Sequence, residues 1–272
     1  MIDSWKKERY GFDDLVGIMK LLRSENGCPW DLGQTHESIR RNFLEEAYEA
    51  VEAIDDHDSA HLCEELGDVM LQVVFHAQIE KDAGGFDISD VTDGICRKLI
   101  LRHPHIFGDV NVKDADEVLR NWDEIKKVEK GQKSHSDTLS AVAKSLPALI
   151  RAEKIQHKAA KAGFDWPDIK GALSKLSEET TELLEAVEGH GDAKDELGDV
   201  LFSAVNVARF LDADPEEALM QACEKFIRRF RHVEERVFMD GKKLEELSLD
   251  KMDKLWDESK AIEAGGTTPT GF

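Results

Sequence analysis

The sequence Glu-Leu-Gly-Asp-Val occupies residues 65–69 and recurs unchanged at residues 196–200, which lie 131 positions further along the chain. Four further landmarks repeat in the same order, at offsets between 127 and 136. They pair Gly27–Trp30 with Gly163–Trp166, residues 45–49 with 178–182, Lys98 and Arg102 with Lys225 and Arg229, and Trp122 and Lys126 with Trp256 and Lys260. Because coincidence would not keep five registers in order, we infer a tandem duplication.

Each repeat has the apolar spacing of helices rather than of strands. The first helical stripe comprises Leu44, Ala47, Tyr48, Val51 and Ile54, and the second comprises Leu173, Leu176, Thr180, Leu183 and Val187. We expect each stripe to face a core. The length of 272 residues suits two domains at about 150 residues each. The sequence therefore predicts an all-α fold of two tandem helical bundles, at residues 1–130 and 141–263, joined by a polar loop at 131–140 and followed by a disordered tail at 264–272.

The charge balance narrows the classes of partner. With 36 basic and 57 acidic residues the net charge is −21, a field that repels nucleic acid. The longest apolar run is far shorter than the roughly 20 residues of a membrane span, and no secretory signal is present. We therefore expect no membrane association and a cytoplasmic location. The four cysteines form no Cys-x-x-Cys pair and are expected to be reduced and buried: Cys28, Cys63, Cys96 and Cys223.

Residues 45–68 hold ten acidic side chains and no lysine or arginine. Glu46 and Glu49, like Glu65 and Asp68, are three positions apart and share a helix face. The 16 residues from Glu49 to Glu65 allow a turn and an antiparallel helix, so the four carboxylates can converge. Their mutual repulsion is relieved by a divalent cation, and oxygen ligands without histidine or cysteine favour Mg²⁺ or Mn²⁺.

The alternative is that Glu-x-x-Glu marks only a solvated helix face. The presence of two such pairs in each half favours the metal site. In the second half the pairs are separated by 14 residues, from Glu182 to Glu196, close to the 16 residues of the first half. Gly67 and Gly198 add to this, because glycine inside a helix costs about 1 kcal/mol relative to alanine. We expect close approach of a backbone or ligand there, or close helix packing.

Cations follow each acidic segment at helical spacing. Lys98 and Arg102, like Lys225 and Arg229, are four residues apart and would share a helix face. Lysine and arginine beside a magnesium ion are suited to neutralising a polyphosphate. Further downstream, each half has a tryptophan followed four positions later by a lysine: Trp122 with Lys126, and Trp256 with Lys260. The indole ring could stack on a nucleotide base, or it could simply pack against other side chains.

Several nucleotide and hydrolase motifs are absent from the sequence. It contains no Gly-x-x-x-x-Gly-Lys phosphate loop, no Gly-x-Gly-x-x-Gly element and no Gly-x-Ser-x-Gly. His57 and His61 are expected in the turn between two helices rather than as metal ligands. His103 and His105 flank Pro104 and are expected to shape a loop.

Taken together, these motifs resemble one family. The decisive stretches are Gly27–Asp31, the duplicated Glu-Glu-x-x-Glu and Glu-x-x-Asp pairs, residues 102–107 and residues 225–230. The chain is similar to the MazG family of tandem-domain nucleoside triphosphate pyrophosphohydrolases from about Phe12 to Lys260. The resemblance implies helical bundles that dimerise. It also implies Mg²⁺-dependent cleavage of NTPs and dNTPs to the monophosphate and pyrophosphate.

The resemblance also assigns residues, by position in the motifs. The implied metal ligands are Glu179, Glu182, Glu196 and Asp199 in the second half, with Glu46, Glu49, Glu65 and Asp68 as their counterparts. The implied nucleotide contacts are Lys175, Lys225, Arg229 and Trp256. Asn42 stands where the second half has Lys175. The family resemblance and this difference both favour the second half as the working domain, although the first retains its acidic quartet.

The hypothesis is in-line attack of a metal-activated water on the α-phosphorus. Glu179 holds metal, and Glu178 is a candidate for orienting or deprotonating the water. Two alternatives stay open: an enzyme restricted to one pyrimidine nucleotide, and a non-catalytic acidic module that docks a basic protein. Each apolar stripe has few helices to cover it, which predicts a homodimer.

Overall fold

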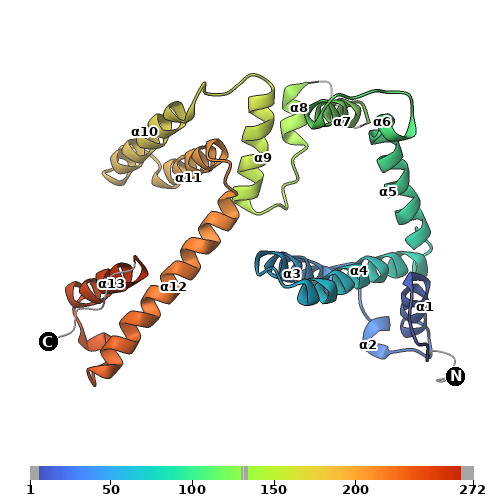
Figure 1. The fold of residues 1–272 in the computed structure, drawn as a ribbon, viewed down its shortest axis with the longest axis horizontal. Helices are drawn as coiled ribbons and strands as arrows, with labels where there is room; N and C mark the ends of the chain where they lie inside the picture. Colours follow the sequence, from blue (N-terminus) through green and yellow to red (C-terminus); the bar gives the residue numbers. More distant parts are fainter. Residues whose placement is uncertain (1–5, 130, 132–133, 265–272) are drawn as a thin grey trace. The chain divides into compact units, whose positions relative to one another are not determined.

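The computed structural model describes residues 6–129, 131 and 134–264. All regular elements in this part of the chain are helices, which confirms the all-α prediction. The chain divides between Val128 and Glu129 into two compact units (Figure 1). Over the same residues, none of the helices has the length and apolarity needed to cross a membrane.

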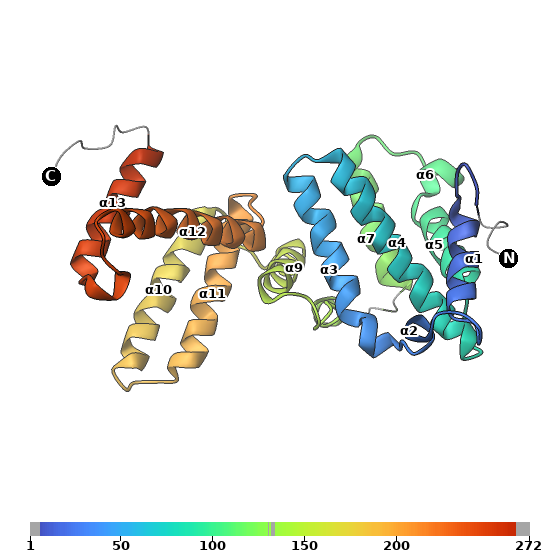
Figure 2. The ribbon, with the colours of Figure 1, turned by 90° about the horizontal axis from the view of Figure 1, so that it is seen from below.

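The first unit is organised around a helical hairpin. Helices α3 and α4 run antiparallel and side by side (Figure 2), and α1 packs against α4. The helices of this unit are α1 (Phe12–Leu22), α2 (Pro29–Leu32), α3 (His36–Asp55), α4 (Ser59–Asp82), α5 (Ile88–Arg102), α6 (Pro104–Phe107) and α7 (Ala115–Glu129). The segment between Glu49 and Glu65 thus contains the turn that the acidic spacing predicts, at residues 56–58 between α3 and α4.

Local capping fixes the ends of this hairpin. Thr35 Oγ1 accepts a hydrogen bond from the backbone N–H of Ser38 and starts α3 (3.3 Å). His57 turns the chain with a φ of 55°, in the left-handed region. Asp58 then accepts hydrogen bonds from the N–H groups of Ala60 and His61 at 3.0 Å and starts α4. His57 lies in the expected turn, whereas His61 lies in the first turn of α4.

The core of the first unit lies between α1, α3 and α4. Met19, Ile39, Val74 and Phe75 are buried together. These residues lie toward the start of α3 and the end of α4, away from the turn. They hold the hairpin from one end and leave its acidic middle outside the apolar core.

The second unit repeats the hairpin. Helices α10 and α11 pair closely, α9 packs on α11, and α13 packs along α12. The elements are α8 (His135–Ser140), α9 (Ala148–Lys161), α10 (Ile169–Val187), α11 (Ala193–Phe210), α12 (Pro215–Met239), the 3₁₀ helix η2 (Leu244–Glu246) and α13 (Leu249–Glu263). The order of hairpin, cation-bearing helix and tryptophan-bearing helix is therefore the same in both halves.

The expectation that the apolar stripes face a core is wrong within one chain. Of the first stripe, Leu44, Tyr48, Val51 and Ile54 are exposed on α3, and of the second, Leu173, Thr180 and Val187 are exposed on α10. Ala47, Leu176 and Leu183 are half-buried, and Leu184, beside the second stripe, is exposed as well. The buried positions of α3 include Ala50 and Ala53, and those of α10 are Ala172, Glu179 and Ala186. The helices approach each other through small residues and carboxylates, so the bulky apolar face points outward.

Three smaller expectations also need correction. Cys63, Cys96 and Cys223 are exposed and Cys28 is half-buried, so the free cysteines are not core residues. The segment 131–140 contains the helix α8, which begins because Ser134 Oγ accepts a hydrogen bond from the N–H of Asp137 (3.0 Å). His103 is the N-cap of the short helix α6 and His105 lies within it, so neither shapes a loop. Of the expected tail at 264–272, residues 265–272 lie outside the described residues.

Candidate functional site

The second unit gathers three carboxylates between α10 and α11. Glu179, Glu196 and Asp199 each offer one oxygen, and these oxygens lie within 4.8 Å of one another. Glu179 comes from α10, whereas Glu196 and Asp199 come from α11, where a spacing of three residues puts them on one face. Glu179 is only 5% exposed, so its charge is held where hydration is poor. The hairpin thus creates a compact set of hard oxygen donors.

Glu182 adjoins this set, one turn further along α10. Partial desolvation raises the pKa of its carboxyl, and a hydrogen bond and charge repulsion from Glu179 raise it further. A raised pKa is expected when carboxylates crowd together without a cation. The structure therefore places all four expected ligands of the second half in one neighbourhood, with Glu182 outside the tightest group.

Lys175 is the cation nearest to these carboxylates on α10. Its Nζ lies 2.7 Å from Oε1 of Glu178 and 2.7 Å from Oε1 of Glu179. Hydrogen bonds to these two carboxylates raise the pKa of Lys175 well above its usual value. Lys175 therefore carries a permanent positive charge at the edge of the acidic cluster.

The first unit forms the corresponding cluster between α3 and α4. Oxygens of Glu46, Glu49 and Glu65 lie within 4.8 Å of one another. Desolvation raises the pKa of Glu46, and repulsion from Asp68 raises it further, so Asp68 is close enough to act on this group. Among the described residues, the buried Oε2 of Glu65 has no hydrogen-bond partner. A buried carboxylate oxygen left unpaired in this way favours binding of a cation.

The two clusters differ in the nitrogen-bearing side chain that accompanies them. In the first unit His61 Nε2 lies 3.1 Å from Oε1 of Glu65. Asn42 occupies the position that corresponds to Lys175. The sequence interpretation assigned no role to His61. The structure shows that it pairs with a member of the acidic set.

The glycines of the repeated pentapeptide are not explained by packing within the chain. A Cβ built on Gly67 or on Gly198 would meet no other group within 4 Å. Among the described residues, close helix packing therefore does not explain why glycine occupies positions 67 and 198. The space beside both glycines is open to a ligand or to another molecule.

The cations and tryptophans downstream of each hairpin form matching pairs. The guanidinium carbon of Arg229 lies 5.8 Å from the ring centroid of Trp256, and that of Arg102 lies 5.3 Å from the ring of Trp122. Arg229 also donates hydrogen bonds to Glu263 Oε2 at 2.8 and 2.6 Å. The lysines predicted with these groups are Lys98 on α5, Lys126 on α7, Lys225 on α12 and Lys260 on α13, where Lys260 pairs with Asp257 at 3.0 Å.

In the second unit these two groups of side chains do not converge. Lys225, Arg229, Trp256 and Lys260 lie on α12 and α13, whereas the carboxylates and Lys175 lie on α10 and α11. Figures 1 and 2 both show α13 along α12 and away from the α10–α11 hairpin. One chain therefore presents the acidic cluster and the arginine–tryptophan pair on different faces of the second unit.

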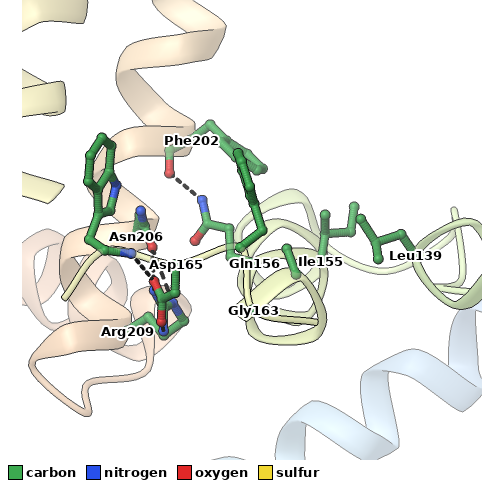
Figure 3. Close-up of a pocket in the computed structure, with 11 residues that line it drawn as sticks. Leu139, Ile155, Gln156, Gly163, Asp165, Phe202, Asn206 and Arg209 are labelled. Atoms are coloured by element: carbon green, nitrogen blue, oxygen red, sulfur yellow. Dashed lines mark hydrogen bonds and ion pairs between the residues drawn. The ribbon is translucent and has the colours of Figure 1, made fainter. Parts of the chain in front are cut away.

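The sequence interpretation missed a pocket of about 410 Å³ beside α11 (Figure 3). Its walls include Gln156 of α9, Trp166 of the following loop, and Phe202, Asn206 and Arg209 of α11. The repeat did signal this region, because Gly163–Trp166 is one of its landmarks. No spacing rule pointed to the glutamine or the asparagine, since each becomes notable only when α9 packs on α11.

The raised pKa values predict how stability depends on pH. Desolvation and repulsion from Glu49 raise the pKa of Glu65 above the 4.5 of an unperturbed glutamate. A raised folded-state pKa stabilises the fold below the unfolded value, and this stabilisation is lost as pH rises through the folded value. Without divalent ions, we therefore expect Glu65→Gln to melt at a higher temperature than the wild type at pH 7 and at a similar temperature at pH 4.

Thermal unfolding followed by circular dichroism in a chelating buffer measures this difference. Glu52→Gln, at an exposed position of α3, is the matched control and should show no such pH dependence. A Glu65→Gln variant that is equally or less stable than the wild type at pH 7 would contradict the account of carboxylate repulsion.

Comparison with known proteins agrees with this arrangement. The MazG nucleotide pyrophosphohydrolase domain matches residues 34–107 and again residues 169–234, which contain the two hairpins. The chain is 47% identical to the nucleoside triphosphate pyrophosphohydrolase/pyrophosphatase MazG of Thermotoga maritima, over 92% of this chain and 95% of that protein. It is 43% identical to the nucleoside triphosphate pyrophosphohydrolase of Escherichia coli K12, over 92% and 97%. The chain, with its two acidic hairpins, belongs to the MazG family.

Proposed function

We propose that this protein is a Mg²⁺-dependent nucleoside triphosphate pyrophosphohydrolase that converts NTPs and dNTPs to monophosphates and pyrophosphate. The observation that carries the proposal is the carboxylate cluster of α10 and α11 with Lys175 beside it. The names of the Thermotoga maritima and Escherichia coli relatives support the same activity.

The side chains present fit a small hard cation. The donors are carboxylate oxygens only. Desolvation, together with repulsion from neighbouring carboxylates, raises the pKa values of Glu46, Glu65 and Glu182, and a divalent ion relieves that repulsion. Mg²⁺, or Mn²⁺ with the same donors, would be held by Glu179, Glu182, Glu196 and Asp199, and by Glu46, Glu49, Glu65 and Asp68 in the first unit. When bound, the ion neutralises phosphate oxygens and makes water a better nucleophile.

The protein's own groups then position the triphosphate. The ammonium of Lys175 lies at the rim of the cluster and is suited to a non-bridging phosphate oxygen. We assign the same role to Lys225 and Arg229, with Trp256 beside them and Lys260 one turn beyond it, and in the first unit to Lys98 and Arg102 beside Trp122 and Lys126. In the second unit, Lys225, Arg229 and Trp256 lie on a different face from the carboxylates. We therefore propose that a second copy of the chain supplies these groups to the carboxylate cluster.

The chemical step exchanges one phosphorus–oxygen bond for another. The water oxygen bonds to the α-phosphorus as the bond from that phosphorus to the bridging oxygen of the β-phosphate breaks. Pyrophosphate leaves, and the proton of the water passes to a carboxylate. Glu178 is our candidate for that base, because it lies beside Glu179 and its Oε1 is held 2.7 Å from Lys175 Nζ.

We place most of the activity in the second unit. It has Lys175, where the first unit has Asn42. We also propose a homodimer, because the large apolar side chains of α3 and α10 are exposed in the single chain. We also propose a cytoplasmic location for the enzyme.

Product identification tests the proposal. Purified protein with a dNTP and Mg²⁺ should release one monophosphate and one pyrophosphate per turnover, measured by chromatography and a pyrophosphate assay. Release of orthophosphate and a diphosphate would exclude attack at the α-phosphorus. Absence of any hydrolysis across all eight common NTPs and dNTPs would favour the interaction module, and turnover of one pyrimidine alone would favour the restricted enzyme.

A further inference from the structure

Glu263, the last residue of α13, is a carboxylate among positive charges. Its Oε2 accepts hydrogen bonds from Nε and from one terminal nitrogen of Arg229, at 2.8 and 2.6 Å. Its Oε1 lies 4.0 Å from Nε of Arg228. Hydrogen bonding to Arg229 lowers the pKa of Glu263 against the effect of desolvation, and the charges of Arg229, Arg228 and Lys225 lower it further. An ionised acid therefore lies beside an arginine that we assign to the phosphates.

The duplication contains this acid twice. Glu263 follows Trp256 by seven residues on α13, and Glu129 follows Trp122 by seven residues on α7. Both glutamates are the last residues of their helices, and positions seven apart lie on one side of a helix. A carboxylate beside a phosphate-binding arginine repels the phosphate. Its presence in both halves therefore calls for a compensating role.

The guanidinium of Arg229 is held on one edge and on one face. Glu263 occupies the edge formed by Nε and one terminal nitrogen, and the guanidinium carbon lies 5.8 Å from the ring centroid of Trp256. The ring centroid of Phe226 lies 4.9 Å from that of Trp256 and supports it from α12. The Arg229 side chain is 19% exposed. These contacts restrict its rotamers far more than those of a free surface arginine.

The other terminal nitrogen of Arg229 is left for a ligand. Within the described part of the chain, this nitrogen donates no hydrogen bond. A guanidinium is a rigid planar fork with five N–H donors, so fixing one edge also orients the other. An anion that meets the free edge finds its donors already in place.

The local charge stays positive while Glu263 is ionised. Lys225, Arg228 and Arg229 of α12 all act on the one carboxylate of Glu263. Three positive charges against one negative charge still attract a polyphosphate. The carboxylate can therefore order the arginine without abolishing the attraction of this helix for phosphate.

We propose that Glu263 is a positioning residue for the triphosphate: it holds the guanidinium of Arg229 against Trp256, so that the free edge meets a phosphate oxygen. The proposal rests on the proposed function, because that function assigns Arg229 to the phosphates. Glu263 itself makes no contact with the substrate.

Binding of inorganic tripolyphosphate with Mg²⁺ to the full chain, measured by calorimetry, tests the proposal. Glu263→Ala should weaken this binding about three- to tenfold, the cost of ordering one long side chain on binding. Glu263→Gln keeps an acceptor of the same size and should restore the affinity to within about twofold of the wild type. Asp253→Ala, which removes an exposed carboxylate from the same helix, is the matched control and should leave the affinity unchanged.

A double-mutant cycle separates positioning from a general structural role. If Glu263 acts through Arg229, Glu263→Ala should cause no further loss of affinity in protein that already carries Arg229→Ala. In steady-state kinetics with an NTP, Glu263→Ala should raise KM and leave kcat within about twofold, because the ordering cost falls on binding.

Tighter binding by Glu263→Ala would overturn the proposal, since it would show that the carboxylate competes with phosphate for Arg229. An unchanged affinity, or an equal loss with and without Arg229, would overturn it as well. Failure of the proposed function has a different signature: Glu263→Ala would weaken tripolyphosphate binding, and yet the wild-type protein would release no pyrophosphate. The binding series therefore decides the role of Glu263, and the product assay decides the activity.

Discussion

Glu179→Gln should lower the Mg²⁺-dependent release of pyrophosphate at least about 100-fold. Loss of a residue that merely orients a metal ligand costs 10- to 100-fold, and Glu179 is proposed as a ligand itself. The change keeps the size of the side chain but removes one negative charge from the three-carboxylate cluster. It also removes a charged partner 2.7 Å from Lys175. Steady-state kinetics with a coupled pyrophosphate assay measures the effect.

Glu46→Gln is the matched control, because the repeat places Glu46 where the second unit has Glu179. If the second unit carries most of the activity, this variant should retain turnover within about twofold of the wild type. Wild-type turnover by Glu179→Gln would overturn the metal assignment. Equal losses in the two variants would overturn the assignment of activity to the second unit.

The double variant Tyr48→Asp, Leu184→Asp should convert a dimer into a monomer of 30.6 kDa. Both side chains are exposed in the single chain, Leu184 at 62%, and lie on the outer apolar faces of α3 and α10. Burying a leucine contributes about 1.5–3 kcal/mol, and burying an unpaired carboxylate adds a penalty. We therefore expect the dissociation constant to rise at least about 100-fold. Sedimentation and light scattering measure the mass.

Val128→Asp is the control, since Val128 is 82% exposed but lies at the end of α7, outside both hairpins. It should leave the dimer intact. A double variant that stays dimeric would show that another surface joins the chains. A wild-type protein that is monomeric at micromolar concentration would remove the dimer from the proposal.

The hairpins and their acidic clusters could be predicted because helices obey short-range rules. Carboxylates three residues apart, such as Glu46 and Glu49, must share a face, and a return helix must bring Glu65 to them. The duplicated pentapeptide then predicts the same cluster a second time. The arginines and the tryptophans belong to separate repeated landmarks of the sequence, and the structure brings Arg102 to Trp122 and Arg229 to Trp256.

The direction of the apolar stripes could not be predicted in this way. Periodicity shows that Leu44, Tyr48 and Val51 share a face, but it does not say what covers that face. The structure buries Ala50, Ala53 and the Glu65 carboxylate instead, because small residues let α3 and α4 approach closely. A face that reads as core in the sequence is therefore a surface of the single chain.

The sequence by itself determined the helical class, the duplication and the carboxylates that gather on each hairpin. The class and the clusters follow from spacing along one or two neighbouring helices, and the duplication follows from landmarks that recur in order at nearly constant offset. Only the tertiary structure decided that Phe75 fills a core while Asn206 lines a pocket, and that Gln156 turns an unpaired oxygen toward it. These outcomes depend on how α1 packs on α4 in the first unit and how α9 packs on α11 in the second, and contacts between helices distant in sequence leave no periodic pattern.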